Sequence, residues 1–598
     1  MNKYIKYCIL PAIAASTIFY VYLSFVVSAN SDNMSSLLIA KDIAEGNLRL
    51  DGWSMSTQSY LFSDIIWTAL VIKMIGYHPI IVHAIPGILY CFISFAAIRL
   101  ASLNGIKSAL LILPTILIPT HFTVANSDQL NIHIGIYALS ALSLLIFNSK
   151  REKINLPTII GLSIIAGLFA ESDKLLLVIF ILPVMIASVL HLILFKRQQY
   201  LKFLAFALLS AIFYKLFGLL NPHIFAYTTP GIGSQGFASV DAMFTNTKLL
   251  LDGCFRYFGA DPENDNVPVN IFRILCLVSF AMVFSYSAIS RWKSSFIDTI
   301  LVLSSLMPVC AFIFSTVAID ENSTRFVFFS FYSSSILIAR TIVLKKETLI
   351  AIPVIIALSL ANLASFTGKK ETDEKYYARL GAFLEHNNLK YGYAWFWSAS
   401  ITSAISNVHV YPVEIFDGVK PMMWLSKKEW FSNKGNFVLT RNAEEYNAAL
   451  NQFGTPAKVI DFERTKILVW DTIIFPPNGY SISRINKGTL PTISGEYKDG
   501  EVRGTDQEGF VLFGPYIPLN KGTYKLTIKG HGSKNGDVID IVDNSKSTVI
   551  YMAELSFDKN GEFSTKINLP EDFNSVELRV HTKGNPDLAI KGYSILPE

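Results

Sequence analysis

The first segment of this sequence that can support chemistry is residues 30–60, which follow directly on the first apolar segment. Asp32 stands near its start, where lipid meets water, and Asp42 follows on an expected amphipathic helix. A carboxylate at a membrane surface is costly unless it has a partner or a task. One such task is to act as a general base that removes a proton from a hydroxyl group. The alternative is a helix-end charge in a solvated loop.

Three further places combine charged residues with apolar runs. Asp128 lies in ILIPTHFTVANSDQLNIH, Asp173 and Lys174 lie in GLFAESDKLLLVIFILP, and Arg325 begins an apolar run over 325–344. Each has a structural alternative. Asp128 can cap a helix that begins near Leu130. Asp173 and Lys174 can pair with each other at a helix end, and Arg325 can simply anchor its helix.

The composition predicts that a large part of the chain lies in a lipid bilayer. Of the 598 residues, 51% are hydrophobic and 16% are charged, whereas soluble domains carry about 25% charged residues. Apolar runs dominate from residue 7 to about residue 366, and the remainder is typical of soluble protein. The net charge of +5 is small for this length and indicates no nucleic-acid partner. None of the five cysteines follows residue 310, and none has metal-ligand spacing.

Basic residues predict the topology, because positive clusters in short loops mark the cytoplasmic side. Lys3 with Lys6 and Arg99 with Lys107 are two such clusters. An even number of crossings must separate them, yet the apolar segments 7–29, 60–76 and 80–98 all lie between them. Segment 60–76 is the weakest of the three, so we expect it to lie along the outer membrane surface. It contains three polar or charged residues, Ser63, Asp64 and Lys73.

With this assignment about eleven helices cross the membrane, the N-terminus is cytoplasmic, and everything after residue 368 is extracytoplasmic. The expected location is the inner (cytoplasmic) membrane of a bacterium, with the C-terminal domains in the periplasm. The loops 30–59, 120–129, 172–174, 221–268 and 319–324 then share the outer face. The candidate residues therefore converge on one side of the membrane.

Three features together resemble the GT-C superfamily of polytopic glycosyltransferases. They are an acidic residue just after the first helix (Ser31-Asp32-Asn33), a short helix that ends in proline before an acidic loop with Asp128, and a helix that ends in an acidic and basic step with Lys174. This superfamily includes the catalytic subunit of oligosaccharyltransferase, the protein O-mannosyltransferases and the bacterial aminoarabinose transferase. The resemblance covers roughly residues 1–220.

The resemblance implies an inverting transfer of a sugar, of hexosyltransferase type, from a polyprenyl-phosphate donor. Asp32 would be the general base, and Asp128 would orient the acceptor or assist. Lys174 and Arg325 would bind the lipid phosphate. Asp173 and Asp42 complete the expected substrate-binding set.

The sequence also departs from the family pattern. The second acid of the first loop, often present in the mannosyltransferases, is Asn33 here, and the Trp-Trp-Asp triplet of oligosaccharyltransferase is absent. Both departures argue against a protein acceptor and favour a cell-envelope glycan, such as a lipopolysaccharide O-antigen. The need for a divalent metal stays open, because no ligand cluster indicates one.

Two other functions compete with this one. A surface-polysaccharide polymerase or ligase would be expected to place arginines at its outward site, and this chain has few of them there. A non-catalytic transporter or receptor with a sugar-binding outer domain would need acids or broken helices near the middle of the membrane.

The expected fold is a GT-C-like helical membrane domain over residues 1–368, a small extracytoplasmic α/β domain over 369–474 and a C-terminal antiparallel β-sandwich of jelly-roll type over 475–598. Within the first domain, the long loop 221–268 begins with a glycine-rich stretch, and we expect it to form a lid over the donor or a disordered spacer. The aromatic residues of YGYAWFW, with Trp424 and Trp430, either stack on sugars or belong to a core or an interfacial belt. The sandwich either binds carbohydrate or is a structural cap.

Overall fold

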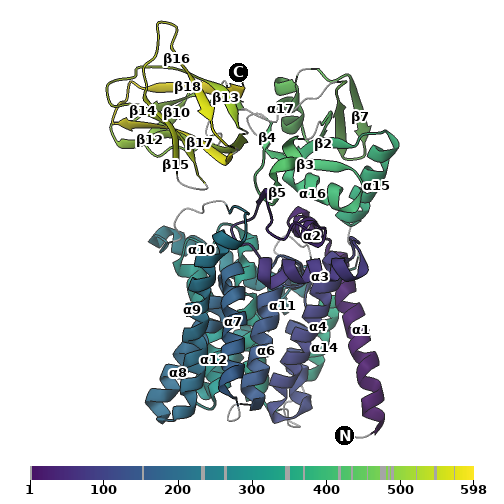
Figure 1. The fold of residues 1–598 in the computed structure, drawn as a ribbon. Coiled ribbons are helices and arrows are strands. Elements are labelled where there is room, and N and C mark those ends of the chain that lie inside the picture. Colours follow the sequence, from purple (N-terminus) through teal and green to yellow (C-terminus); the bar gives the residue numbers. More distant parts are fainter. Residues whose placement is uncertain are drawn as a thin grey trace.

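The computed structural model describes residues 3–150, 154–229, 236–260, 266–343, 351–367, 371–414, 419–432, 435–453, 455–471, 480–482, 485, 490–519, 521–544, 548–571 and 573–597. A bundle of apolar helices forms one end of the molecule, and two β-rich domains lie at the other end (Figure 1). The N-terminus lies at the end of the bundle remote from these domains (Figure 1). The glycine-rich residues 230–235, part of the expected lid, lie outside the described residues.

The bundle is built from apolar helices that share one continuous core. They are α1 (Lys3–Val27), α4 (Ile81–Ala101), α6 (Ile134–Lys150), α7 (Leu156–Ser172), α8 (Leu182–Phe195), α9 (Leu201–Ile224), α10 (Val240–Tyr257), α11 (Val267–Arg291), α12 (Phe296–Phe314), α13 (Phe328–Thr341) and α14 (Ala351–Ala364). Short helical elements connect or extend them: η2 (Ser102–Asn104), η3 (Ile106–Ile112), η4 (Leu113–Leu117), α5 (His121–Ala125), η5 (Leu177–Ile181), η6 (Gln198–Tyr200) and η7 (Glu321–Val327).

Five helical stretches among the described residues are long and apolar enough to cross a membrane: Ile81–Asn104, Leu177–Phe195, Gln198–Ile224, Val267–Arg291 and Phe296–Phe314. A sixth arises if α1 and α2 (Ser31–Ala44), which meet at 119°, form one broken span. The expected count of about eleven is not confirmed, because other apolar helices such as Leu156–Ser172 and Ala351–Ala364 fall short of the required length. The coarser expectation of a multi-pass helical membrane part holds.

Helix α11 illustrates why this part belongs in lipid. Only 6% of the most apolar 18-residue stretch of this helix is buried inside the protein. Its exposed face carries large apolar side chains, among them Ile271, Leu275, Val278, Met282 and Ile289. An apolar face of this extent is stable in a bilayer and would be a liability in water.

The segment that was expected to lie on the outer surface forms η1 (Leu61–Ile65) and α3 (Ile66–Ile75). Neither belongs to the described spans. Together with α2, α3 lies at the junction between the bundle and the β-rich domains (Figure 1). Trp67, Leu70 and Met74 of α3 are exposed, while Ala69 and Ile72 are buried, so the helix has an apolar outward face. This arrangement agrees with an interfacial helix.

The first β-rich domain contains a mixed sheet with the strand order β4-β3-β2-β6-β8-β7. The strands are β2 (Tyr391–Trp395), β3 (His409–Glu414), β4 (Lys420–Pro421), β6 (Phe437–Thr440), β7 (Lys458–Phe462) and β8 (Thr465–Val469). Helix α16 (Phe396–Ile405) joins the parallel strands β2 and β3 as a crossover. Helices α15 (Asp373–His386) and α17 (Ala443–Phe453) and the turn η9 (Lys428–Ser432) complete this α/β domain.

The C-terminal domain is a sandwich of two antiparallel sheets, with the orders β10-β11-β18-β13-β16 and β12-β17-β14-β15, and β9 pairs with β18. The strands are β9 (Tyr480–Ile482), β10 (Gly495–Lys498), β11 (Glu501–Gly504), β12 (Glu508–Leu519), β13 (Gly522–His531), β14 (Val538–Asp543), β15 (Thr548–Glu554), β16 (Glu562–Leu569), β17 (Phe573–Lys583) and β18 (Ala589–Pro597). Alternate residues Tyr524, Leu526 and Ile528 of β13 point into the core, as the period of two in the sequence predicts. The expected β-rich C-terminal region is therefore confirmed.

The α/β domain docks tightly on the junction helices. Strands β1 (Trp53–Ser54) and β5 (Ser426–Lys427) pair, although they are far apart in the sequence. One apolar core combines Leu37 of α2 and Ile72 of α3 with Ile401 of α16. This shared core fixes the position of the residues between β4 and β5 relative to α2.

Candidate functional site

The first turn of α2 holds Asp32 at the junction. Asn30 caps the helix, and its side chain and that of Asn33 accept hydrogen bonds from each other's backbone N–H groups. The Asn33 side chain also donates a 2.6 Å hydrogen bond to the carbonyl of Leu130. An acid in a first turn is favoured by the helix dipole. Asn33 therefore has a structural role here.

Asp32 is half-buried and faces two partners from distant parts of the chain. The guanidinium of Arg325 attracts its carboxylate, and the Trp424 side chain forms a hydrogen bond with it. Burial raises the pKa of Asp32, and both partners oppose that rise. The arrangement brings a proton acceptor under the electrostatic influence of a cation and into contact with a tryptophan of the α/β domain.

Arg325 is held in place by the backbone of η7. Asp320 and Ser323 form a capping box at the start of this element. The Tyr137 hydroxyl donates a 3.0 Å hydrogen bond to the carbonyl of Arg325. The guanidinium lies 5.0 Å from the centre of the Phe326 ring. Arg325 is therefore a positioned cation rather than a free surface charge.

A second polar centre lies close to the first. Nδ1 of His133 is 2.6 Å from a carboxylate oxygen of Asp173, and both side chains are buried. The pairing of Asp173 with Lys174 that the sequence left open is not seen among the described contacts, since Asp173 pairs with His133 instead. Tyr60 packs against the His133 ring at 5.6 Å and interacts electrostatically with Asp173, Arg325 and Asp32, so it joins the two centres.

Asp64, within the segment that we expected only to cover the surface, belongs to this second centre. Its carboxylate accepts hydrogen bonds from the Ser63 hydroxyl at 2.6 Å and from the Gly135 backbone at 3.2 Å. Burial, which the nearby Asp173 reinforces, raises the pKa of Asp64 to about 7, and the two hydrogen bonds limit the rise. Asp64 therefore titrates close to neutral pH.

Asp128 lies apart from these centres. Its side chain is fully buried, and neither carboxylate oxygen has a hydrogen-bond partner within the described part of the chain. The ionisable groups that it influences are Tyr20 and Tyr90, on α1 and α4. Burial alone raises the pKa of Asp128 well above its usual range. Within the described part of the chain no hydrogen bond or ion pair joins Asp128 to Asp32, so its expected role as the second catalytic residue stays a prediction.

Asp42 ties the junction together. Its carboxylate accepts hydrogen bonds from Trp53 at 2.7 Å and Asn47 at 2.6 Å, and it pairs with Lys427 of the α/β domain at 3.1 Å. Asp42 lies about 15 Å along α2 from Asp32, at 1.5 Å per residue. These contacts account for Asp42 without a substrate, and its expected binding role stays untested.

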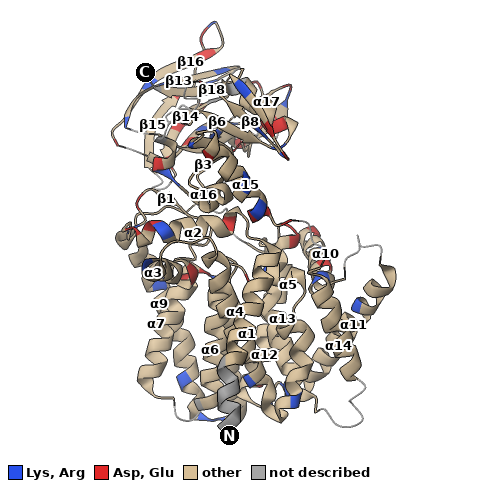
Figure 2. Cartoon of the chain, turned by 90° about the vertical axis from the view of Figure 1, so that its right-hand side faces the viewer, with Lys and Arg blue, Asp and Glu red and all other residues tan. Residues whose placement is uncertain are grey.

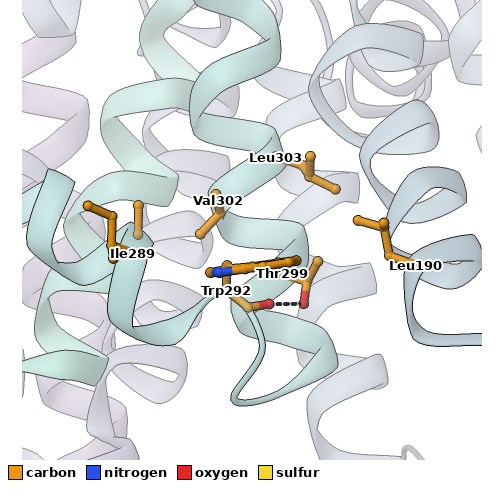
Figure 3. Close-up of a pocket in the computed structure, with 7 residues that line it drawn as sticks. Leu190, Ile289, Trp292, Thr299, Val302 and Leu303 are labelled. Atoms are coloured by element: carbon orange, nitrogen blue, oxygen red, sulfur yellow. Dashed lines mark hydrogen bonds between the residues drawn. The ribbon is translucent and has the colours of Figure 1, made fainter. Parts of the chain in front are cut away.

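Lys174 is exposed and lines a polar cavity of about 250 Å3 at the ends of α7 and α9. The groups that act on Asp32 are Arg325 and Trp424, and Lys174 is not one of them. A separate cleft of about 270 Å3 between α8, α11 and α12 is mostly apolar, with Leu190, Trp292 and Leu303 in its wall (Figure 3). The Thr299 hydroxyl there donates to the backbone carbonyl of Trp292, so this cleft suits acyl chains rather than polar chemistry.

Charge is unevenly distributed along the bundle. Figure 2 shows acidic residues gathered at the end of the bundle nearest the β-rich domains, whereas Lys and Arg lie at both ends. Among the described residues, no group of three or more His, Cys, Asp or Glu side chains is arranged to hold a metal ion.

Sequence reasoning missed several members of these centres. Trp424 was treated only as one of several aromatic residues, and nothing in its local sequence points to Asp32. Tyr60, Asp64 and His133 gave a weak signal, since each is a polar residue flanked by apolar ones. His83, in contrast, has partners on both ring nitrogens and belongs to neither centre.

Comparisons with known proteins leave the family open. No protein-family model matches this chain, and no curated protein matches it. Among solved structures, the C-terminal CBM6 of LamC from Zobellia galactanivorans is similar to 20% of this chain and 99% of its own. Sequence identity is 14% and the TM-score is 0.16, so this similarity carries no argument about function.

Proposed function

We propose that this chain is an inverting membrane glycosyltransferase of GT-C type. It moves a sugar from a polyprenyl-phosphate donor to a cell-envelope glycan, such as a lipopolysaccharide O-antigen, on the extracytoplasmic face. Asp32 is the general base, and Arg325 binds the donor phosphate.

The observation that carries this proposal is the electrostatic attraction between Asp32 and Arg325 at one end of an apolar helix bundle. A polyprenyl tail is too apolar to leave the bilayer, so the reacting sugar phosphate must be bound at the membrane edge. Transfer there needs a group that accepts a proton and a cation that stabilises the departing phosphate. Asp32 and Arg325 supply these two groups at the same end of the bundle.

In the proposed reaction, Asp32 takes the proton of an acceptor hydroxyl as its oxygen attacks the anomeric carbon. The bond between that carbon and the phosphate oxygen breaks, and its electron pair leaves with the polyprenyl phosphate. A single displacement from the opposite face inverts the configuration. The raised pKa of Asp32 makes it a stronger base than an exposed aspartate.

Two further features support a lipid-linked donor. An apolar groove of about 380 Å3 runs along α1, with Ile18, Val21 and Phe25 in its wall, on the part of α1 nearest Asp32. Trp424 covers Asp32 from the side of the α/β domain, so the acid lies between lipid and a folded lid rather than in open water.

The decisive experiment is Asp32→Asn in the full chain, reconstituted in vesicles and assayed for transfer from a series of polyprenyl-phosphate hexoses. Loss of a general base typically costs about 10²–10⁴-fold in rate, and we expect a loss in that range. Asp51→Asn is the matched control, since Asp51 is an exposed acid of the same loop. Normal transfer by a stably inserted Asp32→Asn variant would show that Asp32 is not the general base.

A further inference from the structure

A polar cavity at the ends of α7 and α9 has no role in the reaction described above. Its volume is about 250 Å3, and its wall includes Gln58, Ser59, Glu171, Lys174, Asn221 and Tyr227. It lies beside the candidate site, because Ser59 precedes Tyr60 and the Tyr60 N–H donates a 3.1 Å hydrogen bond to Ser172 at the end of α7. Tyr60 itself faces Arg325 and Asp32.

The polar groups of this cavity form a chain with one free end. The side-chain amide of Asn221 donates to one carboxylate oxygen of Glu171 and lies 2.6 Å from the Tyr227 hydroxyl. Tyr227 is in turn hydrogen-bonded to Ser59. The second carboxylate oxygen of Glu171 is buried and has no hydrogen-bond partner within the described residues. Glu171 therefore presents a carboxylate with unfilled acceptor capacity at the wall of this cavity.

The charges of the cavity select a neutral ligand. Lys174 lies near enough to Glu171 to attract it, so one positive and one negative group face the same space. An anion such as phosphate would meet the carboxylate, and a cation would meet the ammonium. A neutral ligand with many hydroxyl groups can donate to Glu171 and accept from Lys174.

Size and shape indicate a single sugar ring. The cavity lies below the roughly 300–1,000 Å3 of sites that hold drug-sized ligands. Phe225 and Pro222 add an apolar wall on which the CH groups of a pyranose can pack. We propose that this cavity binds the terminal neutral monosaccharide of the acceptor glycan. The identity of that sugar as an acceptor rests on the proposed function, whereas its binding does not.

Gly218 offers a way to fill the cavity without disturbing the fold. It lines the cavity from α9, and a Cβ placed there meets no atom within 4 Å. Leucine is a good helix former, so Gly218→Leu should fold while it blocks the ligand. Gly161→Leu on α7 is the matched control, because its Cβ also meets no atom within 4 Å. Glu171→Gln tests the free acceptor, and the exposed Glu444→Gln is its control.

Binding is measured on the full chain in nanodiscs by saturation-transfer NMR, with free neutral hexoses, hexuronic acids and inorganic phosphate as probes. We expect at least one neutral hexose to bind, with a dissociation constant raised tenfold or more in Gly218→Leu and Glu171→Gln and unchanged in both controls. Failure of every neutral hexose to bind, preferential binding of the anions, or equal hexose binding by Gly218→Leu would overturn the cavity assignment.

The transfer assay separates the two proposals. Asp32→Asn should keep hexose binding and lose transfer. If hexose binding depends on Gly218 but no transfer occurs from any donor, the cavity assignment stands and the glycosyltransferase proposal falls. If transfer occurs and Gly218→Leu leaves both hexose binding and the KM for acceptor unchanged, the glycosyltransferase proposal stands and the cavity assignment falls.

Discussion

Nε2 of His83, on α4, lies 2.5 Å from a carboxylate oxygen of Glu374, on α15 of the α/β domain. Both side chains are buried. The other ring nitrogen of His83 is 3.0 Å from the Ser24 hydroxyl, and Glu374 also accepts a 3.2 Å hydrogen bond from the Ala29 backbone. This contact joins the α/β domain to the ends of α1 and α4, and thereby helps to keep Trp424 above Asp32.

Glu374→Ala should therefore destabilise the docked structure. Removal of one partner of a buried pair leaves the other without compensation, which typically costs about 3–5 kcal/mol. We expect a clear fall in the thermal unfolding midpoint. The midpoint is measured in detergent from the change in tryptophan fluorescence on heating. Glu371→Ala is the control, because Glu371 is exposed and pairs with Arg379 at the surface, where ion pairs add little. Equal midpoints for the two variants would show that the His83 contact does not hold the domain.

Trp424→Phe tests the contact between the α/β domain and Asp32. The change keeps an aromatic ring and removes the indole N–H, whose hydrogen bond lowers the pKa of Asp32. The pKa of Asp32 should rise, so the acidic limb of the pH–rate profile for transfer should move to higher pH. Hydrogen bonds to charged groups are worth about 1.5–3 kcal/mol, which is large enough for the displacement of the acidic limb to be measured.

The control for this change is Trp430→Phe. Trp430, from the same domain as Trp424, packs on Trp53 of β1 and on Tyr411 of β3 and is not among the groups that act on Asp32. An unchanged pH profile in Trp424→Phe would contradict a role of Trp424 at the acid.

The local sequence could predict that Asp32 and Arg325 lie at the same end of the helical part. It could not predict that Trp424 lies beside Asp32. Asp32 and Arg325 stand beside apolar runs, where a charge is conspicuous. Trp424 lies in a short connection whose neighbours are unremarkable. Its position depends on the pairing of β1 with β5 and on a core shared by α2 and α16. Such long-range packing leaves no periodic signal in the sequence.

The fold was predictable to a similar extent. The period of two in residues 508–597 predicts the strands of the sandwich, and the polar interruptions of 60–76 predict a segment that does not cross. The number of crossings was not predictable, because an apolar run such as 106–119 predicts a span by composition, whereas the structure breaks it into η3 and η4. Pro114, at the start of η4, lacks a backbone N–H and favours such a break.

Arg325→Ala should weaken binding of the lipid-linked donor. Arg325 is the cation that faces Asp32, and a guanidinium can form two parallel hydrogen bonds to a phosphate. We expect the KM for polyprenyl-phosphate sugar to rise at least about tenfold, since charged hydrogen bonds are worth about 1.5–3 kcal/mol. Arg325→Lys should recover part of this loss, because lysine keeps the positive charge but cannot form the two parallel hydrogen bonds of a guanidinium.

Arg256→Ala serves as the control, since Arg256 pairs with Glu321 at 2.9 Å on the partly exposed side of η7. A KM for donor that is the same in Arg325→Ala and Arg256→Ala would exclude Arg325 as the phosphate ligand.

Asp64→Asn should change how stability depends on pH. The pKa of Asp64 is raised to about 7 in the folded chain, whereas an unfolded aspartate has a pKa of about 3.9. The folded state thus favours the protonated acid, and this contribution is full below about pH 4 and is lost as pH rises through about 7. The unfolding midpoint of the parent protein should fall between pH 5 and 8 more steeply than that of Asp64→Asn. Parallel curves for the two proteins would show that Asp64 is ionised throughout.

Asp128→Asn separates a catalytic role from a structural one. Burial favours the neutral form of Asp128, so the neutral and similarly shaped Asn side chain should leave the unfolding midpoint nearly unchanged. If Asp128 assists the acceptor, transfer should fall about 10²-fold or more despite the retained stability. Asp252→Asn, on α10, is a control with the same chemical change at a half-buried position. Retained stability with full transfer would assign the reaction to Asp32 without Asp128, and lost stability would make Asp128 a structural acid whose partner is still to be found.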